Sequence, residues 1–281
     1  MDITVSEKYL WFPVDMSGEM VWVSVYDGDQ KIQEMKVSLG KEHIDFYGVW
    51  KATEYLGKEL RIVSEKGEEY LDGVDIRQEK TRPQNDYPYR PRLHYTPAYG
   101  WVNDPNGLVY VDGVYHMFHQ YNPYSTEWQN MSWGHATSTD LVTWEHHGDA
   151  ISPDALGTIF SGSCVVDKDN TAGFGAGAVI AFYTSASDRQ VQSMAYSLDN
   201  GKTFKKYARN PILTSTQRDF RDPKVIWHED TKKWIMVLAV GQEMEIYSSA
   251  DLKSWTLESK FGEGQGAHGG VWECPDLLEL P

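Results

Sequence analysis

The sequence has little positive charge and no long hydrophobic run. It contains 26 Lys and Arg residues against 41 Asp and Glu residues, a formal net charge of −15. Because phosphate-rich surfaces bind proteins through clustered basic side chains, this balance argues against nucleic acid and anionic membranes as partners. The longest apolar runs, Ala176–Tyr183 and Trp234–Val240, are far shorter than the roughly 20 residues of a spanning helix. We therefore expect no membrane insertion and no nucleic-acid partner.

Cysteine is also scarce. Cys164 and Cys274 are too few for a disulfide framework and too far apart in the sequence for a metal motif. We therefore expect both to be free thiols. His116 and His119, three residues apart on an expected strand, face opposite sides of it. The sequence thus indicates neither a metal nor a cofactor.

Aromatic residues, in contrast, are abundant, with 11 Trp, 17 Tyr and 9 Phe among 281 residues. Sugar rings stack on aromatic faces and sugar hydroxyls bond to carboxylates, so an acidic, Trp-rich composition is common in carbohydrate-handling proteins. Aromatic side chains are also common in cores, so composition alone does not decide the function.

Short runs of β-branched and aromatic residues, bounded by Gly, Asp and Asn, predict an all-β fold. In the first 80 residues, the segments 20–26 and 31–37 flank Asp27-Gly28-Asp29 and predict a hairpin. The polar stretch 77–86 is typical of a linker. We place a domain boundary near Asn85, with a small β-sandwich-like accessory domain over residues 1–85 and a second domain over 86–281.

A repeated turn signature predicts the architecture of the second domain. Three strand-turn-aromatic segments align on Asp140, Asp199 and Asp251, which are 59 and 52 residues apart. This period suits four-stranded blades around an axis and favours a β-propeller. A two-sheet sandwich is the alternative, but it does not repeat a turn at this interval.

Four short motifs occupy one phase of the repeat: WVNDPNG, FSGS, FRDP and WECPD. Their markers Asp104, Ser161, Asp222 and Glu273 are 57, 61 and 51 residues apart, so they fall at equivalent places on consecutive blades and converge on the axis. Carboxylates crowded in a cleft cannot all ionise cheaply, so one is expected to be protonated while another remains an anion. Retaining glycoside hydrolysis uses such a pair, as acid/base and nucleophile.

In their order and spacing, these motifs resemble glycoside hydrolase family 32, the β-fructofuranosidases that include invertases, inulinases and levanases. The resemblance covers residues 92–281 and implies a five-bladed propeller followed by a β-sandwich. It implies that Asp104 is the nucleophile, that Glu273 is the acid/base, and that Asp222 stabilises the transition state. It further implies a fructosyl subsite lined by Asn103, Gln120, Trp128, Phe160, Ser161 and Arg221. No cofactor is implied, and the substrate would be sucrose, inulin or levan.

Several alternatives stay open at this stage. The sister five-bladed arabinan and xylan glycosidases also use three acidic residues, and fructosyl transfer would use the same intermediate as hydrolysis. A non-catalytic fructan-binding fragment would keep the subsite without turnover. Residues 1–85 fit either a sugar-binding module or a cap at the mouth of the active site.

The two ends of the chain also raise expectations. Met1–Thr4 lacks the features of a signal peptide, so the chain is cytosolic or has lost its export signal, and we favour export. Pro281 follows Glu273 by eight residues, within the expected first strand of a fourth blade. About three and a half blades would then be present, and we expect the C-terminal part of the enzyme as a second chain or fragment.

Overall fold

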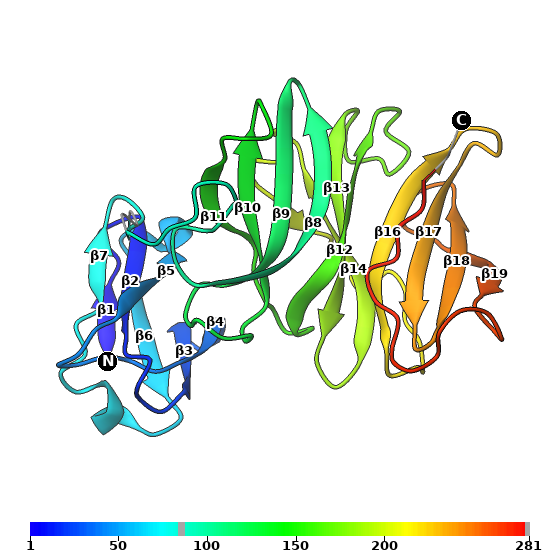
Figure 1. Ribbon diagram of the computed structural model, residues 1–281. Coiled ribbons are helices and arrows are strands. Elements are labelled where there is room, and N and C mark those ends of the chain that lie inside the picture. The colour runs from blue at the N-terminus through cyan, green and yellow to red at the C-terminus, as the bar shows by residue number, and fades with distance from the viewer. Residues whose placement is uncertain (84–87, 279–281) are drawn as a thin grey trace. The chain divides into compact units, whose positions relative to one another are not determined.

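Strands follow one another along most of the chain in the computed structural model, which describes residues 1–83 and 88–278 (Figure 1). Helical structure in these ranges is confined to the 3-10 turns η1 (Thr53–Tyr55) and η2 (Glu68–Leu71), and no helix there is long and apolar enough to cross a membrane. The all-β fold expected from the sequence is confirmed.

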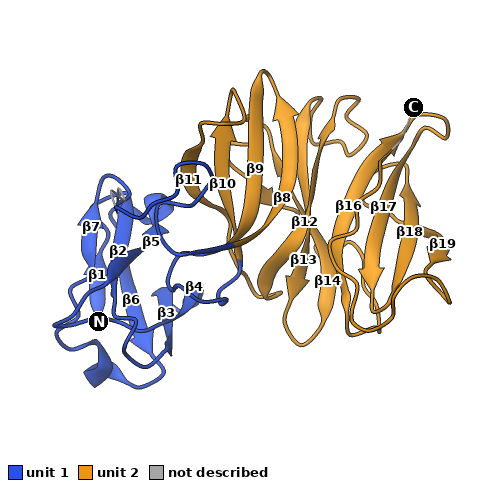
Figure 2. Ribbon diagram, viewed as in Figure 1, with its two compact units in different colours: residues 1–102, 121–131 blue, residues 103–120, 132–281 orange. Residues whose placement is uncertain are grey.

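The chain divides into two compact units (Figure 2). Unit 1 comprises residues 1–102 and 121–131, and unit 2 comprises residues 103–120 together with those from 132 onward. The expected boundary near Asn85 lies outside the described residues and stays a prediction.

Unit 1 contains two antiparallel sheets. The first has the order β1 (Asp2–Thr4), β6 (Glu59–Ser64), β3 (Val21–Asp27) and β4 (Gln30–Val37), and the second has the order β5 (Phe46–Lys51), β2 (Tyr9–Val14) and β7 (Arg77–Glu79). Alternation explains the core, because Val21, Val23 and Val25 are fully buried while Trp22 faces outward. The hairpin expected around Gly28 is present as the β3–β4 pair.

The polar stretch expected to be a linker begins with a strand. Its first residues form β7, in which Arg77 lies opposite Trp11 of β2. An edge strand needs only backbone partners and tolerates polar side chains. The guanidinium groups of Arg77 and Arg82 also lie over the rings of Tyr47 and Tyr9, at 4.6 and 4.9 Å, where cation–π attraction holds the segment against the sheet.

Three four-stranded antiparallel sheets follow, which we call blades 1 to 3. Blade 1 contains β8 (Trp101–Val111), β9 (Val114–Asn122), β10 (Ser132–Ser138) and β11 (Glu145–Ile151). Blade 2 contains β12 (Thr158–Asp167), β13 (Ala178–Ala186), β14 (Gln190–Ser197) and β15 (Lys205–Lys206). Blade 3 contains β16 (Phe220–His228), β17 (Lys233–Val240), β18 (Glu243–Ser249) and β19 (Thr256–Phe261). In each blade neighbouring strands are consecutive in sequence, as in a propeller.

The turn signature that revealed the repeat joins the third and fourth strands of every blade. In blade 1, Oδ1 of Asp140 accepts hydrogen bonds from the backbone N–H groups of Val142 and Thr143, at 2.9 and 2.7 Å. These bonds lower the pKa of Asp140 to about 2. Asp199 and Asp251 accept equivalent backbone bonds in blades 2 and 3. The periodic aspartates are therefore turn caps, which explains why they mark the blade period.

The segment expected to begin a fourth blade forms no strand within its described residues, 271–278. Its backbone makes single bonds instead of a ladder: Trp272 donates its N–H to the Gly241 carbonyl at 2.7 Å. Cys274 donates its N–H to an Asp222 side-chain oxygen at 2.9 Å. A strand needs a neighbouring strand to bond with, and no strand in the described part of the chain pairs with this segment. The expected half blade is thus corrected to three blades and an irregular segment.

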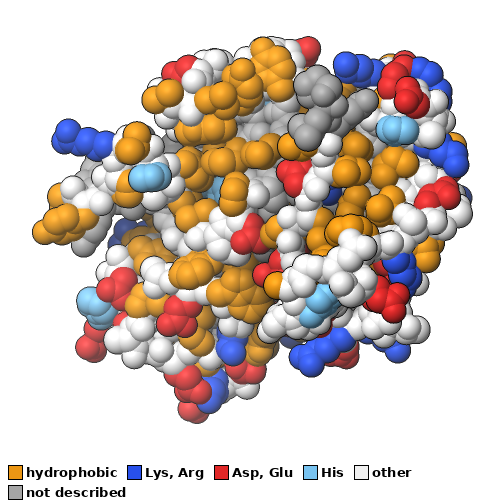
Figure 3. Space-filling view, turned by 45° about the vertical axis from the view of Figure 1, so that its right-hand side comes forward, with side chains coloured by type: hydrophobic (Ala, Val, Ile, Leu, Met, Phe, Trp, Pro, Cys, Tyr) orange, Lys and Arg blue, Asp and Glu red, His pale blue; other side chains and the backbone are white. Residues whose placement is uncertain are grey.

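Charge is dispersed over the surface drawn in Figure 3. Lysine and arginine side chains are interleaved with acidic ones on this face and form no continuous basic surface among the residues drawn. The mixed signs on this face accompany the formal net charge of −15.

Blade 1 contains a buried group of histidines. His135 of β10 is 3% exposed, and its ring stacks on Phe118 at a centroid distance of 4.4 Å. His116 Nδ1 lies 3.0 Å from His135 Nε2, and the His147 ring lies 5.0 Å from the His135 ring. Burial, reinforced by repulsion from neighbouring histidines, lowers the pKa of His135 to about 2. Burial likewise lowers the pKa of His119 to about 4.

These histidines predict a loss of stability in acid. An unfolded histidine binds its proton near pH 6.5, whereas folded His135 stays neutral until far lower pH. Below about pH 6.5 the unfolded state therefore holds more protons, and folding stability falls by roughly 1 kcal/mol per pH unit for each such group. We expect the thermal midpoint to decrease between pH 7 and pH 5, and to decrease less steeply in His135→Gln. The exposed His43 supplies the control, His43→Gln, whose slope should match wild type; an equally steep slope in His135→Gln would contradict the assignment.

Candidate active site

Asp104 lies on β8, the first strand of blade 1, and contacts the first strand of blade 2. Its Oδ2 accepts a hydrogen bond from the Ser161 hydroxyl of β12 at 2.8 Å, and its Oδ1 accepts one from the Asn103 amide at 3.3 Å. The buried Asn106 amide also reaches Ser161 Oγ, at 3.4 Å. The WVNDPNG and FSGS motifs therefore meet side by side, and Asp104 is part of a strand rather than an isolated turn.

Asp222 lies on β16, the first strand of blade 3, and is 6% exposed. Its φ of +61° places it in the left-handed region, which is uncommon for a residue other than glycine. Burial raises the pKa of Asp222, and the charges of Asp104 and Glu273 act in the same direction. The Cys274 N–H and the Arg221 guanidinium oppose this rise.

Arg221 links the remaining carboxylates. One guanidinium nitrogen donates to Glu273 Oε1 at 2.9 Å, another donates to Asp219 Oδ1 at 2.7 Å, and Nε lies 3.9 Å from Asp222 Oδ2. The Arg221 side chain is 11% exposed, whereas that of Glu273 is 62% exposed. Burial lowers the pKa of Arg221, but the bonds to Asp219 and Glu273 outweigh it and the pKa is raised. Arg221 is therefore a mostly buried cation held between acidic groups. Its ion pairs are unlike exposed surface pairs, which contribute little to stability.

Cys274 is a site residue that sequence reasoning missed. Its N–H bonds to Asp222, and its Sγ lies 3.5 Å from Asp104 Oδ2. Its φ of +47° is left-handed, and no local sequence pattern indicates such a conformation at a cysteine. Burial, together with the charges of Asp222 and Asp104, raises the pKa of its thiol, so the thiol is a donor. Both cysteines are free, as expected.

The other predicted subsite residues differ in their surroundings. Gln120 is 3% exposed, and its amide nitrogen donates to the Ile159 carbonyl of β12 at 3.0 Å. The Phe160 carbonyl accepts the indole N–H of Trp133 at 2.9 Å. Trp128 belongs to unit 1 and is 54% exposed. Their roles in sugar binding stay predictions.

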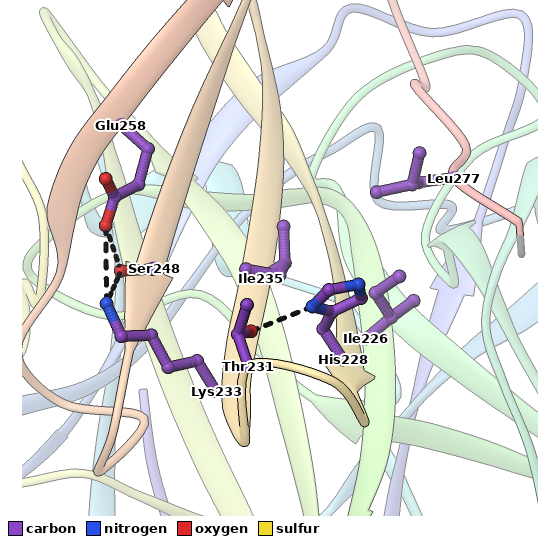
Figure 4. Close-up of a pocket in the computed structure, with 8 residues that line it drawn as sticks. All are labelled: Ile226, His228, Thr231, Lys233, Ile235, Ser248, Glu258 and Leu277. Carbon is purple, nitrogen blue, oxygen red and sulfur yellow. Dashed lines mark hydrogen bonds and ion pairs between the residues drawn. The ribbon is translucent and has the colours of Figure 1, made fainter.

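A pocket of about 400 Å³ lies elsewhere, on blade 3 (Figure 4). It is lined by Ile226, His228, Thr231, Lys233, Ile235, Ser248, Glu258 and Leu277. Its polar groups satisfy one another, since Lys233 lies 3.3 Å from Ser248 Oγ and 3.6 Å from Glu258. None of the three motif carboxylates lines it, so we do not assign the chemistry to this pocket.

A group of potential metal ligands also occurs in unit 1. Asp15, His43 and Asp45 bring ligand-type atoms within 4.8 Å of one another. Protein partners already use these carboxylates, because Asp15 accepts from Ser17 and Asp45 accepts from the Met16 N–H. We assign no metal to them.

Comparison with known proteins assigns the larger part of the chain to a family. Residues 94–281 match the family described as Glycosyl hydrolases family 32 N-terminal domain. The chain belongs to this family. The matched range includes the four motifs that contain Asp104, Ser161, Asp222 and Glu273.

Named relatives of this family 32 chain include a levanase and an exo-inulinase. It is 58% identical over 201 residues to a levanase of Bacillus subtilis, covering 70% of this chain and 30% of that protein. It is 43% identical over 228 residues to an extracellular exo-inulinase of Aspergillus niger, covering 70% of this chain and 42% of that protein. The chain therefore spans less than half the length of these relatives.

Solved structures give the same family. A β-fructofuranosidase from Schwanniomyces occidentalis, complexed with fructosyl-erythritol, superposes with a TM-score of 0.65 at 47% identity, covering 68% of this chain and 40% of that one. An exo-inulinase from Aspergillus awamori gives a TM-score of 0.66 at 42% identity, covering 70% of this chain and 44% of that one. These family 32 neighbours have an N-terminal β-propeller, which confirms the fold class expected from the repeat.

Proposed function

We propose that the whole protein containing this chain hydrolyses β-fructofuranosyl linkages in fructans or sucrose with retention of configuration. The observation that carries the proposal is the convergence of Asp104, Asp222 and Glu273, tied together by Cys274 and Arg221. The levanase, exo-inulinase and β-fructofuranosidase relatives support the substrate class. Because the chain covers less than half of those relatives, the activity is attributed to the whole protein.

The proposed reaction has two steps. The Asp104 carboxylate attacks C2 of the fructosyl unit, while the Glu273 carboxylic acid gives its proton to the departing glycosidic oxygen. This step forms a covalent fructosyl-Asp104 ester and releases an alcohol. The Glu273 carboxylate then takes a proton from water as the water oxygen attacks C2, which releases fructose and restores both carboxyl groups.

The surrounding residues suit this assignment. The bonds from Ser161 and Asn103 orient the Asp104 carboxylate, and orientation of the nucleophile is a major source of rate. Asp222 would hold fructose hydroxyls and stabilise the developing oxocarbenium charge, because an anion placed beforehand needs little reorganisation during reaction. Arg221 would orient Glu273. Gln120 and Phe160 would add to the fructosyl subsite in unit 2, and Trp128 of unit 1 stays a sequence-based candidate for stacking on sugar.

We further propose that the protein is exported. Exo-inulinase relatives of this chain are named as extracellular, and fructans are polymers, which an exported enzyme can reach outside the cell. The rest of the enzyme, on the same or a second chain, would complete the pocket.

Hydrolysis assays test the proposed function. The whole natural protein should release fructose or fructo-oligosaccharides from at least one of sucrose, inulin and levan, as measured by chromatography. Early products observed by NMR should keep the configuration of the substrate, because two displacements at C2 restore it. Inversion would overturn the proposed intermediate, transfer to a sugar would indicate a fructosyltransferase, and binding without turnover would favour a fructan-binding protein.

A further inference from the structure

The strand that carries Asp222 is bulged at that residue. In the β16–β17 ladder, Arg221 pairs with Ala239 and the next pair is Lys224 with Val237. Asp222 and Pro223 therefore lie opposite a single residue, which is the pattern of a β-bulge. The left-handed φ of Asp222 belongs to this bulge, and such a conformation persists only when its surroundings impose it.

The strand β16 is also the edge of its sheet, so its outward backbone groups have no partner strand in blade 3. Buried backbone groups that lack a hydrogen bond are costly. In this structure the partners come from blade 2, and they are side chains rather than backbone.

Three buried side chains of blade 2, which we call the blade 2 clamp, make these bonds: Ser163 of β12, Thr184 of β13 and Gln192 of β14. Thr184 Oγ1 accepts the Asp222 N–H at 3.1 Å and donates to Gln192 Oε1 at 2.8 Å. Gln192 Nε2 donates to the Phe220 carbonyl at 2.7 Å, which closes a ring back to β16.

Ser163 binds the other side of the bulge. Its hydroxyl donates to the Pro223 carbonyl at 2.8 Å and accepts the Val225 N–H at 2.9 Å. Thr184 and Gln192 are 0% exposed and Ser163 is 7% exposed, so water does not readily replace these bonds. The clamp thus bonds four backbone groups between Phe220 and Val225. Gln190 of the same blade accepts the Phe220 N–H at 2.9 Å.

We propose that the blade 2 clamp consists of positioning residues, which hold Asp222 in its left-handed conformation and aim its carboxylate at the substrate. The clamp acts through Asp222 and makes no contact with substrate itself. The inference rests on the proposed function of Asp222 and adds the means by which one blade sets the geometry of the next. A matching bulge in blade 2, between Ile159 and Gly162, carries Ser161. The FSGS and FRDP motifs therefore both lie on bulged strands.

The test compares two changes in the same strand pair. Thr184→Val keeps the shape of the side chain and leaves the Asp222 N–H without its acceptor, so kcat/KM should fall by about tenfold. The matched control is Ser185→Ala: Ser185 is 1% exposed and shares a hydrogen bond of 2.8 Å with Ser193, away from β16. Ser185→Ala should lower the thermal midpoint without lowering kcat/KM. Thr184→Ser restores the hydroxyl and should restore most of the activity.

Asp222→Asn separates the clamp from the proposed function. Full activity of Asp222→Asn would overturn the role of Asp222, whereas an inactive Asp222→Asn beside a fully active Thr184→Val would overturn the clamp alone. In the Asp222→Asn background, Thr184→Val should cause no further loss of the residual rate, because its effect passes through Asp222; a second tenfold loss would contradict the inference. If Thr184→Val does not fold, Ser163→Ala takes its place with the same expected loss, and unchanged activity in that variant would overturn the proposal.

Discussion

Asp104→Asn is expected to lower kcat for fructan hydrolysis by about 10⁴-fold, the scale typical of removing a catalytic nucleophile. The amide keeps the size of the carboxylate and can keep the hydrogen bond from Ser161, so the fold and the binding of sugar should change little. The first step nevertheless fails, because an amide is a poor nucleophile at C2. KM should therefore stay near its wild-type value while kcat falls, as measured by initial rates on levan and sucrose.

Two further variants make this expectation specific. Asp112 lies on the turn that follows β8, where it is exposed and accepts a bond from Asn200, so Asp112→Asn should leave kcat unchanged. In Asp104→Ala, the removed side chain leaves room for a small anion, and added azide should restore turnover with inverted configuration at C2. Wild-type kcat in Asp104→Asn would refute the nucleophile assignment. Loss of activity in Asp112→Asn would show that the effect of Asp104→Asn is not specific to Asp104.

Much of the fold was predictable because its signals are local and repeated. The caps at Asp140, Asp199 and Asp251 satisfy backbone groups within their own turns, so their spacing reports the blade period without knowledge of any distant contact. The first strand of each blade occupies the same place in this period. Asp104 and Asp222 could therefore be predicted to lie at one site.

The remaining features depend on contacts that no local pattern encodes. Cys274 has a left-handed φ of +47° in a segment without strand structure, and its Sγ lies 3.5 Å from Asp104 Oδ2. Thr184 and Gln192 appear in the sequence as ordinary strand residues, and only the neighbouring blade shows that they bond to β16. Arg77 begins a strand because aromatic rings of unit 1 lie beneath its side chain and that of Arg82. In each case, contacts with residues distant in the sequence determine the local structure.

Glu273→Gln is expected to lower kcat for sucrose by about 10³-fold, within the range of general acid–base catalysis. The amide can still accept the hydrogen bond from Arg221, but it has no proton to give to the departing glycosidic oxygen. The size of the defect should depend on the leaving group. Fructosyl fluoride releases fluoride without protonation, so Glu273→Gln should form the fructosyl-Asp104 ester from it nearly as fast as wild type, as measured by a burst of fluoride.

The second step should then be slow in the same variant, because water loses its general base. The covalent ester should accumulate and be detectable by mass spectrometry on a peptide containing Asp104. Glu263, exposed in the same C-terminal segment, provides the matched control, and Glu263→Gln should behave as wild type on both substrates. An equal loss in the rate of the first step on sucrose and on fructosyl fluoride would instead place Glu273 in substrate binding, because only the sucrose leaving group needs a proton.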